Sequence, residues 1–284
     1  MSIDTMTFVG INILLAWSFY VILLTGTISL GNGAFMAIGA YTSSLITLNL
    51  GWSLPLALVC GMALAALFGV LFALPALRTK GIYLLMVTIG IGEATRVFFE
   101  NFAPAGGIRG LGGMTGTTTW GIYLCVLLVL LFLYFLSRSP LQRMFLAVKE
   151  DERVAGALGM NVAVLKILSV MFGSAIAALA GGLFAHYLAF ISPGNFGMWQ
   201  SFLIGLYVIL GGTNNLWGPI LGAAVYTLLP ELLRNVGLVE WRLFIFAVGI
   251  VILMAFRPNG LIHFRVGERR LTATPLAGDG RRRG

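Results

Sequence analysis

The sequence predicts an all-α, polytopic integral membrane protein, and three observations lead to that fold class. Hydrophobic residues make up 59% of the 284 residues and charged residues only 10%, whereas charged residues make up about 25% of an ordinary soluble domain. The apolar residues form continuous runs long enough to cross a bilayer, which takes about 20 helical residues. Because these runs do not alternate with polar residues, they indicate helices that satisfy their own backbone rather than the strands of a barrel.

Nine apolar runs are candidate membrane spans. The first is not a secretory signal, because only Asp4 is charged before it and it exceeds the usual apolar core of about 7 to 15 residues. The stretch "GGTNNLWGP" separates the seventh and eighth runs and favours either a loop or a re-entrant break, so the count is good to about one. The nine runs cover residues 7–25, 30–49, 54–77, 81–100, 119–137, 164–190, 199–212, 216–233 and 241–257.

The distribution of Lys and Arg predicts an N-terminus outside the cell and a C-terminus in the cytoplasm. Short loops rich in Lys and Arg stay on the cytoplasmic side of a membrane. With the loop 138–166 inside, 14 of the 18 basic residues fall on that side of a nine-span layout. The net charge of +8 is therefore explained by residues that flank spans and not by nucleic-acid binding. We expect a membrane domain over residues 1–261 and a disordered basic tail over residues 262–284.

The loop 138–166 is a charged island between two apolar runs, and its pattern predicts two short helices. Ser139 is suited to cap the first helix, and Pro140 is tolerated at its first position. Apolar residues then recur at i, i+3, i+4 and i+7, which places them on one helix face. This face consists of Leu141, Met144, Phe145 and Val148.

A second helix is predicted directly after the first. The acidic triplet at 150–152 suits its N-terminus, because negative charge interacts favourably with that end of the helix dipole. Gly159 is expected to end the helix in the left-handed conformation. The pair of helices is either an amphipathic element resting on lipid headgroups or a docking element whose small residues permit close approach of a protein. The acidic triplet favours docking, because it is poorly suited to an anionic leaflet. The residues assigned to this docking loop are Glu150, Asp151, Glu152, Ala155, Ala157 and Gly159.

Six segments together carry a resemblance that covers residues 26–261. The segment "EDERVAGALGMNVAVLK" is similar to a coupling loop with a Glu-Ala-Ala…Gly pattern, which falls loosely here on Glu152, Ala155, Ala157 and Gly159. The other segments are "SLGNGAFMAIGAYTSSL", "KGIYLLMVTIGIGEATRVFFEN", "AGGLFAHYLAFISPGNFG", "LGGTNNLWGPILGA" and "FRPNGL". In combination they resemble the permeases of the branched-chain amino acid ABC importers, specifically the M-type subunit. The outer loop "PAGGIRGLGG" departs from the family pattern, because it has Arg109 where Asn is common.

The resemblance implies a permease subunit that moves branched-chain or related amino acids into the cytoplasm. It implies two separate ABC ATPase subunits docked on the loop 138–166, a second related permease subunit, a periplasmic solute-binding protein and a location in the bacterial inner membrane. The chain itself is then no enzyme and needs no cofactor, since its partners hydrolyse ATP. Urea, amides and aromatic acids are alternative cargoes of the same kind of permease, and an ion-coupled secondary transporter is the alternative mechanism.

Three polar residues within the apolar runs are candidates for the transport pathway or its gate: Asn32, Glu93 and Arg96. Glu93 and Arg96 stand at i and i+3, so they share a helix face. A charge at the centre of a span costs about 2.5 to 3.5 kcal/mol on insertion scales. We therefore expect the two charges to be paired, near the outer end, or turned toward the protein interior. Asn32 lies between two glycines where the second span begins, which fits a broken helix lining the pathway or a close helix crossing; packing is favoured.

No catalytic, nucleotide or metal site is predicted. The sequence contains no GxxxxGK[ST] phosphate loop and no Ser/His/Asp grouping in a suitable context. Cys60 and Cys125 lie within apolar runs without a second Cys or a His at metal-binding spacing, so neither a disulfide nor a metal site is implied. A weak internal match at an offset of 185 residues, from Gly26 with Gly211 onward, leaves a two-half repeat as an open alternative.

Overall fold

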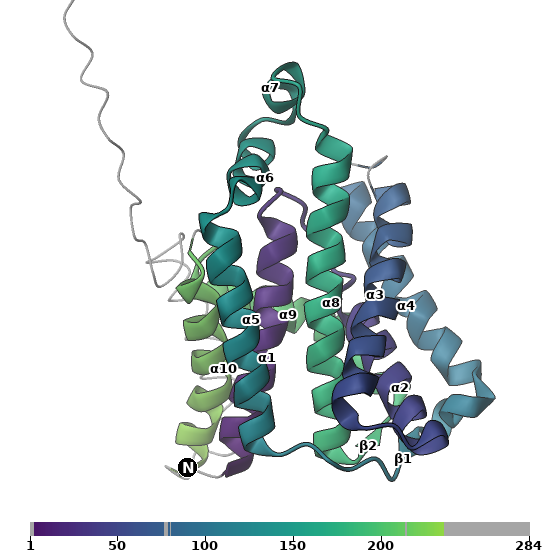
Figure 1. The fold of residues 1–284 in the computed structure, drawn as a ribbon. Coiled ribbons are helices and arrows are strands. Elements are labelled where there is room, and N and C mark those ends of the chain that lie inside the picture. The colour runs from purple at the N-terminus through teal and green to yellow at the C-terminus, as the bar shows by residue number, and fades with distance from the viewer. Residues whose placement is uncertain (1–2, 77–78, 80, 214, 236–284) are drawn as a thin grey trace, which may run out of the picture.

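The computed structural model describes residues 3–76, 79, 81–213 and 215–235, and these residues form a bundle of helices (Figure 1). We call the end of the bundle that carries α7 the α7 end, and the opposite end, where two short strands pair, the ribbon end. The helices are α1 (Ile3–Leu23), α2 (Asn32–Leu50), α3 (Leu54–Ala76), α4 (Ile82–Asn101), α5 (Thr119–Arg138), α6 (Pro140–Glu150), α7 (Glu152–Ala157), α8 (Val162–Leu188), α9 (Met198–Gly211) and α10 (Trp217–Asn235). The remaining elements are the 3-10 turns η1 (Ala103–Ala105), η2 (Gly107–Arg109) and η3 (Pro193–Phe196) and the strands β1 (Leu111–Gly112) and β2 (Phe190–Ile191).

Six helices of the described residues, α1 to α5 and α8, are long and apolar enough to cross a membrane. They correspond to the first six predicted spans, so the prediction of a multi-pass helical membrane protein is confirmed. The predicted seventh and eighth spans correspond to α9 and α10, which are not among those six helices; α9 has only 14 residues, fewer than the roughly 20 of a full crossing. The ninth predicted span, 241–257, and the tail 262–284 lie outside the described residues, so the count of nine is not confirmed.

The long helix α8 forms the centre of the bundle and packs against α1, α2 and α3 (Figure 1). Helices α2 and α8 approach so closely that there is no room for a side chain at two glycines. A Cβ at Gly39 would overlap the backbone of Ala178, and a Cβ at Gly181 would overlap the backbone of Met36. In a membrane, where lipid is as apolar as the helices, such close backbone packing of small residues supplies much of the attraction between helices.

Helix α10 runs antiparallel to α1 and is joined to it by polar contacts. The indole Nε1 of Trp17 donates to the carbonyl oxygen of Leu216 at 3.1 Å, and the Asn12 amide donates to the Thr227 hydroxyl at 2.9 Å. Both ends of α10, Trp217 and Asn235, lie 185 residues after the ends of α2. The helix bounds therefore agree with the internal match at that offset.

Segments without helical structure connect the long helices at both ends of the bundle. At the ribbon end, β1 pairs with β2 in antiparallel register, with Leu111 opposite Ile191. This pairing joins the loop after α4 to the end of α8. At the other end, residues 24–31 lead from α1 into the bundle, where α2 begins.

Candidate functional site

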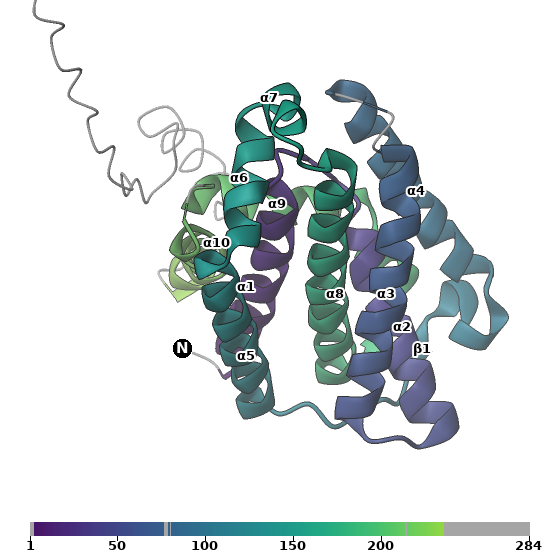
Figure 2. The same ribbon diagram turned by 45° about the horizontal axis from the view of Figure 1, so that its top comes forward.

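The predicted docking loop forms two short helices, α6 and α7, that extend the α5–α8 hairpin beyond the rest of the bundle (Figures 1 and 2). Pro140 occupies the start of α6, as predicted. The predicted cap by Ser139 is wrong, because its hydroxyl donates back to the carbonyl oxygen of Leu136 at 2.7 Å and makes no cap bond to α6. The hydroxyl thus satisfies a carbonyl in the last turn of α5 instead.

Side chains and backbone fix both ends of α7. The carboxylate of Asp151 accepts from the backbone N–H groups of Arg153 at 2.7 Å and Val154 at 3.1 Å, which caps the N-terminus. Gly159 adopts a left-handed φ of +84°, as predicted. The N–H of Met160 then donates to the carbonyl of Ala155 at 3.1 Å, and that of Gly159 to Gly156 at 3.0 Å, which is a Schellman ending. The six-residue helix therefore keeps a defined shape despite its length.

Helices α6 and α7 are anchored to the bundle by apolar burial and by one ion pair. Of the predicted apolar face of α6, Phe145 and Val148 are buried, whereas Met144 is exposed, so the prediction is correct only in part. Lys166 of α8 lies 2.5 Å from the Glu152 carboxylate of α7. The partly exposed ion pair and the buried side chains hold α6 and α7 against the bundle and the start of α8.

The outer surface of α7 combines small residues with two large apolar ones. Of the six residues assigned to the docking loop, Glu152 pairs with α8 and Ala155 is buried toward the bundle. The other four, Glu150, Asp151, Ala157 and Gly159, are exposed. Val154 and Leu158 were not among the predicted site residues, yet they are 56% and 70% exposed at the tip. Their signal in the sequence was the i, i+4 spacing of two apolar side chains within a charged island.

Most of the segment 24–31 is buried although it is not helical, with Gly26 and Ile28 exposed, and hydroxyl groups bond several of its polar atoms. Thr25 and Ser169 share a hydrogen bond of 3.0 Å, and the N–H of Leu30 donates to the Thr88 hydroxyl of α4 at 3.1 Å. The N–H of Gly31 donates to the Ser29 hydroxyl at 3.2 Å. Irregular backbone at membrane depth is tolerated only inside protein or beside a water-filled cavity. The structure thus places an irregular link directly before α2, beside the glycines that flank Asn32, and a role of this link in the transport pathway stays a prediction.

Asn32 is buried at the start of α2 and holds helices together. Its Nδ2 donates to the Ser18 hydroxyl of α1 at 2.8 Å, while its Oδ1 has no hydrogen-bond partner among the described residues. The neighbouring N–H of Gly33 donates to the Ser201 hydroxyl of α9 at 2.9 Å. Asn32 is fully buried and bonds α2 to α1, and its part in the transport pathway stays a prediction.

Glu93 and Arg96 form a pair, as the sequence predicted, and Glu100 joins them. Arg96 Nε lies 2.7 Å from Glu93 Oε2, and Arg96 Nη1 lies 3.0 Å from Glu100 Oε1. The second oxygen of Glu93 accepts the backbone N–H of Met198 at 2.8 Å, so it caps the N-terminus of α9. This charge cluster, Glu93, Arg96 and Glu100, therefore ties α4 to α9 and carries one more negative than positive charge.

The charge cluster lies on the surface of the described residues. The side chains of Glu93, Arg96 and Glu100 are 35%, 34% and 27% exposed. The cluster begins near the middle of the 20-residue α4 and extends toward the ribbon end. Sequence reasoning missed Glu100, although its i+4 spacing from Arg96 was visible. It could not have found Met198, which is 105 residues away from Glu93.

Comparison with known proteins decides the family. The family described as "Branched-chain amino acid transport system / permease component" matches residues 1–255. The chain belongs to this permease family. The permease is 30% identical to the high-affinity branched-chain amino acid transport system permease protein LivM of Salmonella typhimurium, with 98% of the chain and 74% of the relative covered. It is 30% identical to LivM of Escherichia coli, with 92% and 70% covered.

Relatives named for other cargoes also match the permease. The fructose import permease protein FrcC of Rhizobium meliloti is 27% identical, with 82% of the chain and 71% of the relative covered. No solved structure matches the chain. The family thus agrees with the predicted resemblance and with a transport permease rather than an enzyme, while the relatives of the chain are named for amino acid and for sugar import.

Proposed function

We propose that the chain is the membrane-spanning subunit of an ABC importer that moves branched-chain or related amino acids into the cytoplasm, driven by separate ATPase subunits. Family membership supports the permease role. Two relatives at 30% identity are named for branched-chain amino acids, whereas FrcC, named for fructose, is 27% identical, which favours an amino acid cargo. Urea, amides and aromatic acids are the alternative cargoes.

The observation that carries the ATPase-driven mechanism is the surface of α7. Its helix is capped at both ends, held to α8 by the pair Glu152–Lys166, and exposes Val154 and Leu158 away from the bundle. Exposed apolar side chains on a rigid element, next to small residues, are typical of a surface that is buried in the groove of a partner protein and not left in water. An ion-coupled transporter has no ATPase to bind, so that mechanism leaves the exposed apolar surface of α7 unexplained.

The proposed orientation puts the α7 end in the cytoplasm and the ribbon end outside, with the N-terminus outside and the C-terminus inside the bacterial inner membrane. The basic residues of the loop 138–166 support this orientation. The ATPases then dock on α6 and α7, a second permease subunit completes the pathway, and a periplasmic binding protein delivers the solute at the ribbon end. We place the charge cluster of α4 in the outer half of this pathway, at its gate.

The test is transport by the complete importer in proteoliposomes. Uptake is expected only with ATP and both ATPase subunits; accumulation driven by an ion gradient without ATPases would contradict the mechanism. Leu158→Ser should remove the ATPases from the purified complex, because it takes an apolar side chain from the docking surface. Ile108→Ser, which changes an 80% exposed apolar residue near the ribbon end, is the matched control and should keep them.

A further inference from the structure

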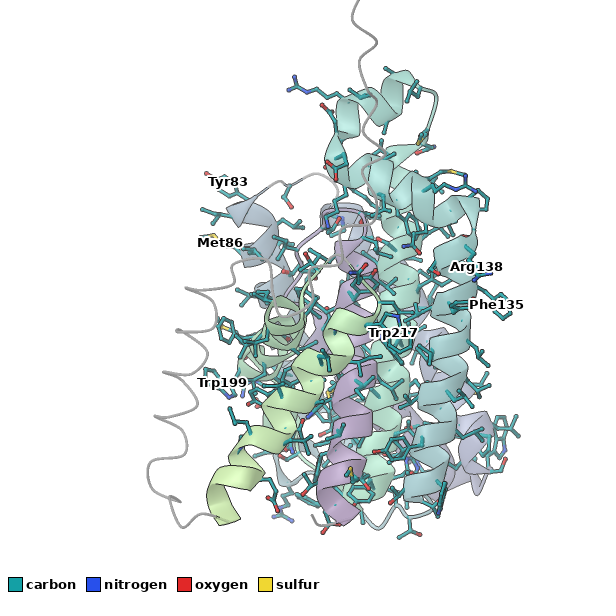
Figure 3. The ribbon with its side chains drawn as sticks, turned by 90° about the vertical axis from the view of Figure 1, so that its left-hand side faces the viewer. Tyr83, Met86, Phe135, Arg138, Trp199 and Trp217 are labelled. Carbon is teal, nitrogen blue, oxygen red and sulfur yellow. The ribbon has the colours of Figure 1, made fainter. Side chains whose placement is uncertain are left out.

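The described residues present two membrane-facing surfaces of different chemistry. On one edge of the molecule lie Tyr83, Met86 and Trp199, and on the opposite edge lie Phe135 and Arg138 (Figure 3). We call the first the α4–α9 face and the second, formed by α3 and α5, the α3–α5 face. The two faces differ in charge, and that difference indicates what covers each.

The α3–α5 face has the composition of a surface that contacts lipid. Helix α3 contains no charged residue, and the only one in α5 is Arg138, its last residue, which lies over the ring of Tyr134 at 4.5 Å. Apart from Ser137 and Arg138 at the end of α5, the exposed side chains of α3 and α5 are aliphatic or aromatic. They include Leu56, Val59, Leu67, Leu71, Leu124, Leu127, Leu128 and Phe135.

The α4–α9 face carries three ionised groups along the second half of α4, a candidate membrane-spanning helix, each about a third exposed: Glu93, Arg96 and Glu100. Ionisable residues inside a membrane face a protein interior or a water-filled cavity, because lipid solvates neither charge nor ion pair. Arg96 balances only one of the two carboxylates, so the cluster keeps a net negative charge that lipid tails would leave unsolvated. Lipid tails are therefore an unfavourable neighbour for this face.

The exposed side chains around the cluster are those that protein interfaces prefer. Trp199 is 71% exposed and stacks on Phe202 at 6.0 Å, and Tyr83 and Met86 are exposed along the same side of α4. Trp, Tyr, Met and Arg are enriched at the centres of protein interfaces, where a large side chain is buried at low entropic cost. The face combines these residues with a polar cluster at its middle.

We infer that the α4–α9 face is the contact surface for a second permease chain, with the charge cluster lining the water-filled path between the two chains. Soluble partners at either end of the bundle do not reach a surface at membrane depth, so the occupant is itself a membrane protein. This inference rests on the proposed function for the existence of a second permease, and it assigns the surface that this partner covers. The α3–α5 face is then left to lipid.

Photo-cross-linking in the complete importer, expressed in its native membrane, tests this assignment. p-Benzoylphenylalanine replaces Trp199 or Met86 on the α4–α9 face, and Leu128 or Phe135 on the α3–α5 face as matched controls. After irradiation, denaturing gels and mass spectrometry identify the protein joined to each position. We expect positions 199 and 86 to give an adduct with a second permease chain, related or identical. Positions 128 and 135 should give no such adduct.

Three results would overturn the assignment. They are an adduct with the second permease from the α3–α5 positions only, no protein adduct from either face, and a link from position 199 that stays within the chain and maps to residues 241–257. Co-purification of the ATPases with each variant shows that the importer has assembled. Loss of the ATPases from the unsubstituted complex would instead count against the proposed function, so the two failures are distinguishable.

Discussion

The contact between α2 and α8 gives a prediction whose magnitude follows from the structure. A Cβ at Gly181 would overlap the carbonyl oxygen of Met36 and lie 2.8 Å from its carbonyl carbon. Gly181→Ala therefore places a methyl group against backbone, which cannot change rotamer, and the helices must separate. Overpacking of this kind costs about 1 to 3 kcal/mol, and a backbone obstacle points to the upper part of that range. Alanine returns about 1 kcal/mol through helix propensity, which leaves a net destabilisation of about 2 kcal/mol.

The matched control for this prediction is Gly90→Ala in α4, where a Cβ would meet nothing within 4 Å. That variant should be neutral or more stable by about 0.5 to 1 kcal/mol. Thermal unfolding in detergent, followed by the reaction of Cys60 and Cys125 with a thiol dye at one scan rate, measures both. On the scale of soluble domains, Gly181→Ala should lower Tm by about 4 to 8 °C. Equal Tm values for the two variants would refute the claim that backbone contact fixes this helix pair.

The docking helix and the charge cluster give two further predictions. Gly159→Ala should uncouple ATP hydrolysis from uptake in proteoliposomes without loss of membrane insertion, because a φ of +84° costs a residue with a Cβ about 1 to 2 kcal/mol and distorts the end of α7. Gly156→Ala, at an open helical position, should transport normally, and equal uptake by the two would argue against the role of this turn. Arg96→Ala should lower uptake and Tm, because it leaves the carboxylates of Glu93 and Glu100 without their cation. Adding Glu93→Gln to Arg96→Ala should restore only part of the lost uptake and Tm, because Glu100 stays charged. A double-mutant cycle that shows no coupling between positions 93 and 96 would reject the pair.

Local features of the docking loop were predictable from the sequence, because each depends on a few neighbouring residues. The left-handed Gly159 follows from the tolerance of glycine for this conformation at a helix end, and the start of α6 follows from Pro140. The predicted cap by Ser139 was wrong. A hydroxyl between two helices can accept from the N–H groups at the start of the following helix or donate to a carbonyl at the end of the preceding one, and Ser139 donates to α5. Which partner the hydroxyl takes depends on the geometry of the last turn of α5, and the apolar pattern of α6 gives no information about that turn.

Contacts between distant segments could not be predicted in the same way. The pair of Glu93 and Arg96 lies within one helix, so spacing was sufficient to expect it. The bond from Glu93 to the N–H of Met198 requires α9 to start beside α4, which is decided by the turn η3 and the ribbon before it. The position of residues 24–31 likewise depends on hydroxyls from α4 and α8, whose positions no local pattern gives.

The two candidate sites are joined by one continuous element. At the α7 end, Glu152 of α7 pairs with Lys166 of α8. Helix α8 then runs for 27 residues without a proline, about 40 Å, and leads through β2 and η3 to Met198, whose N–H is held by Glu93. A displacement of α7 by an ATPase would thus reach the charge cluster through a stiff helix and a short ribbon. Because the bond at Met198 is single and partly exposed, whereas α8 is tightly packed against α2, we expect the contact between α4 and α9 to be the part that changes between two states of the pathway.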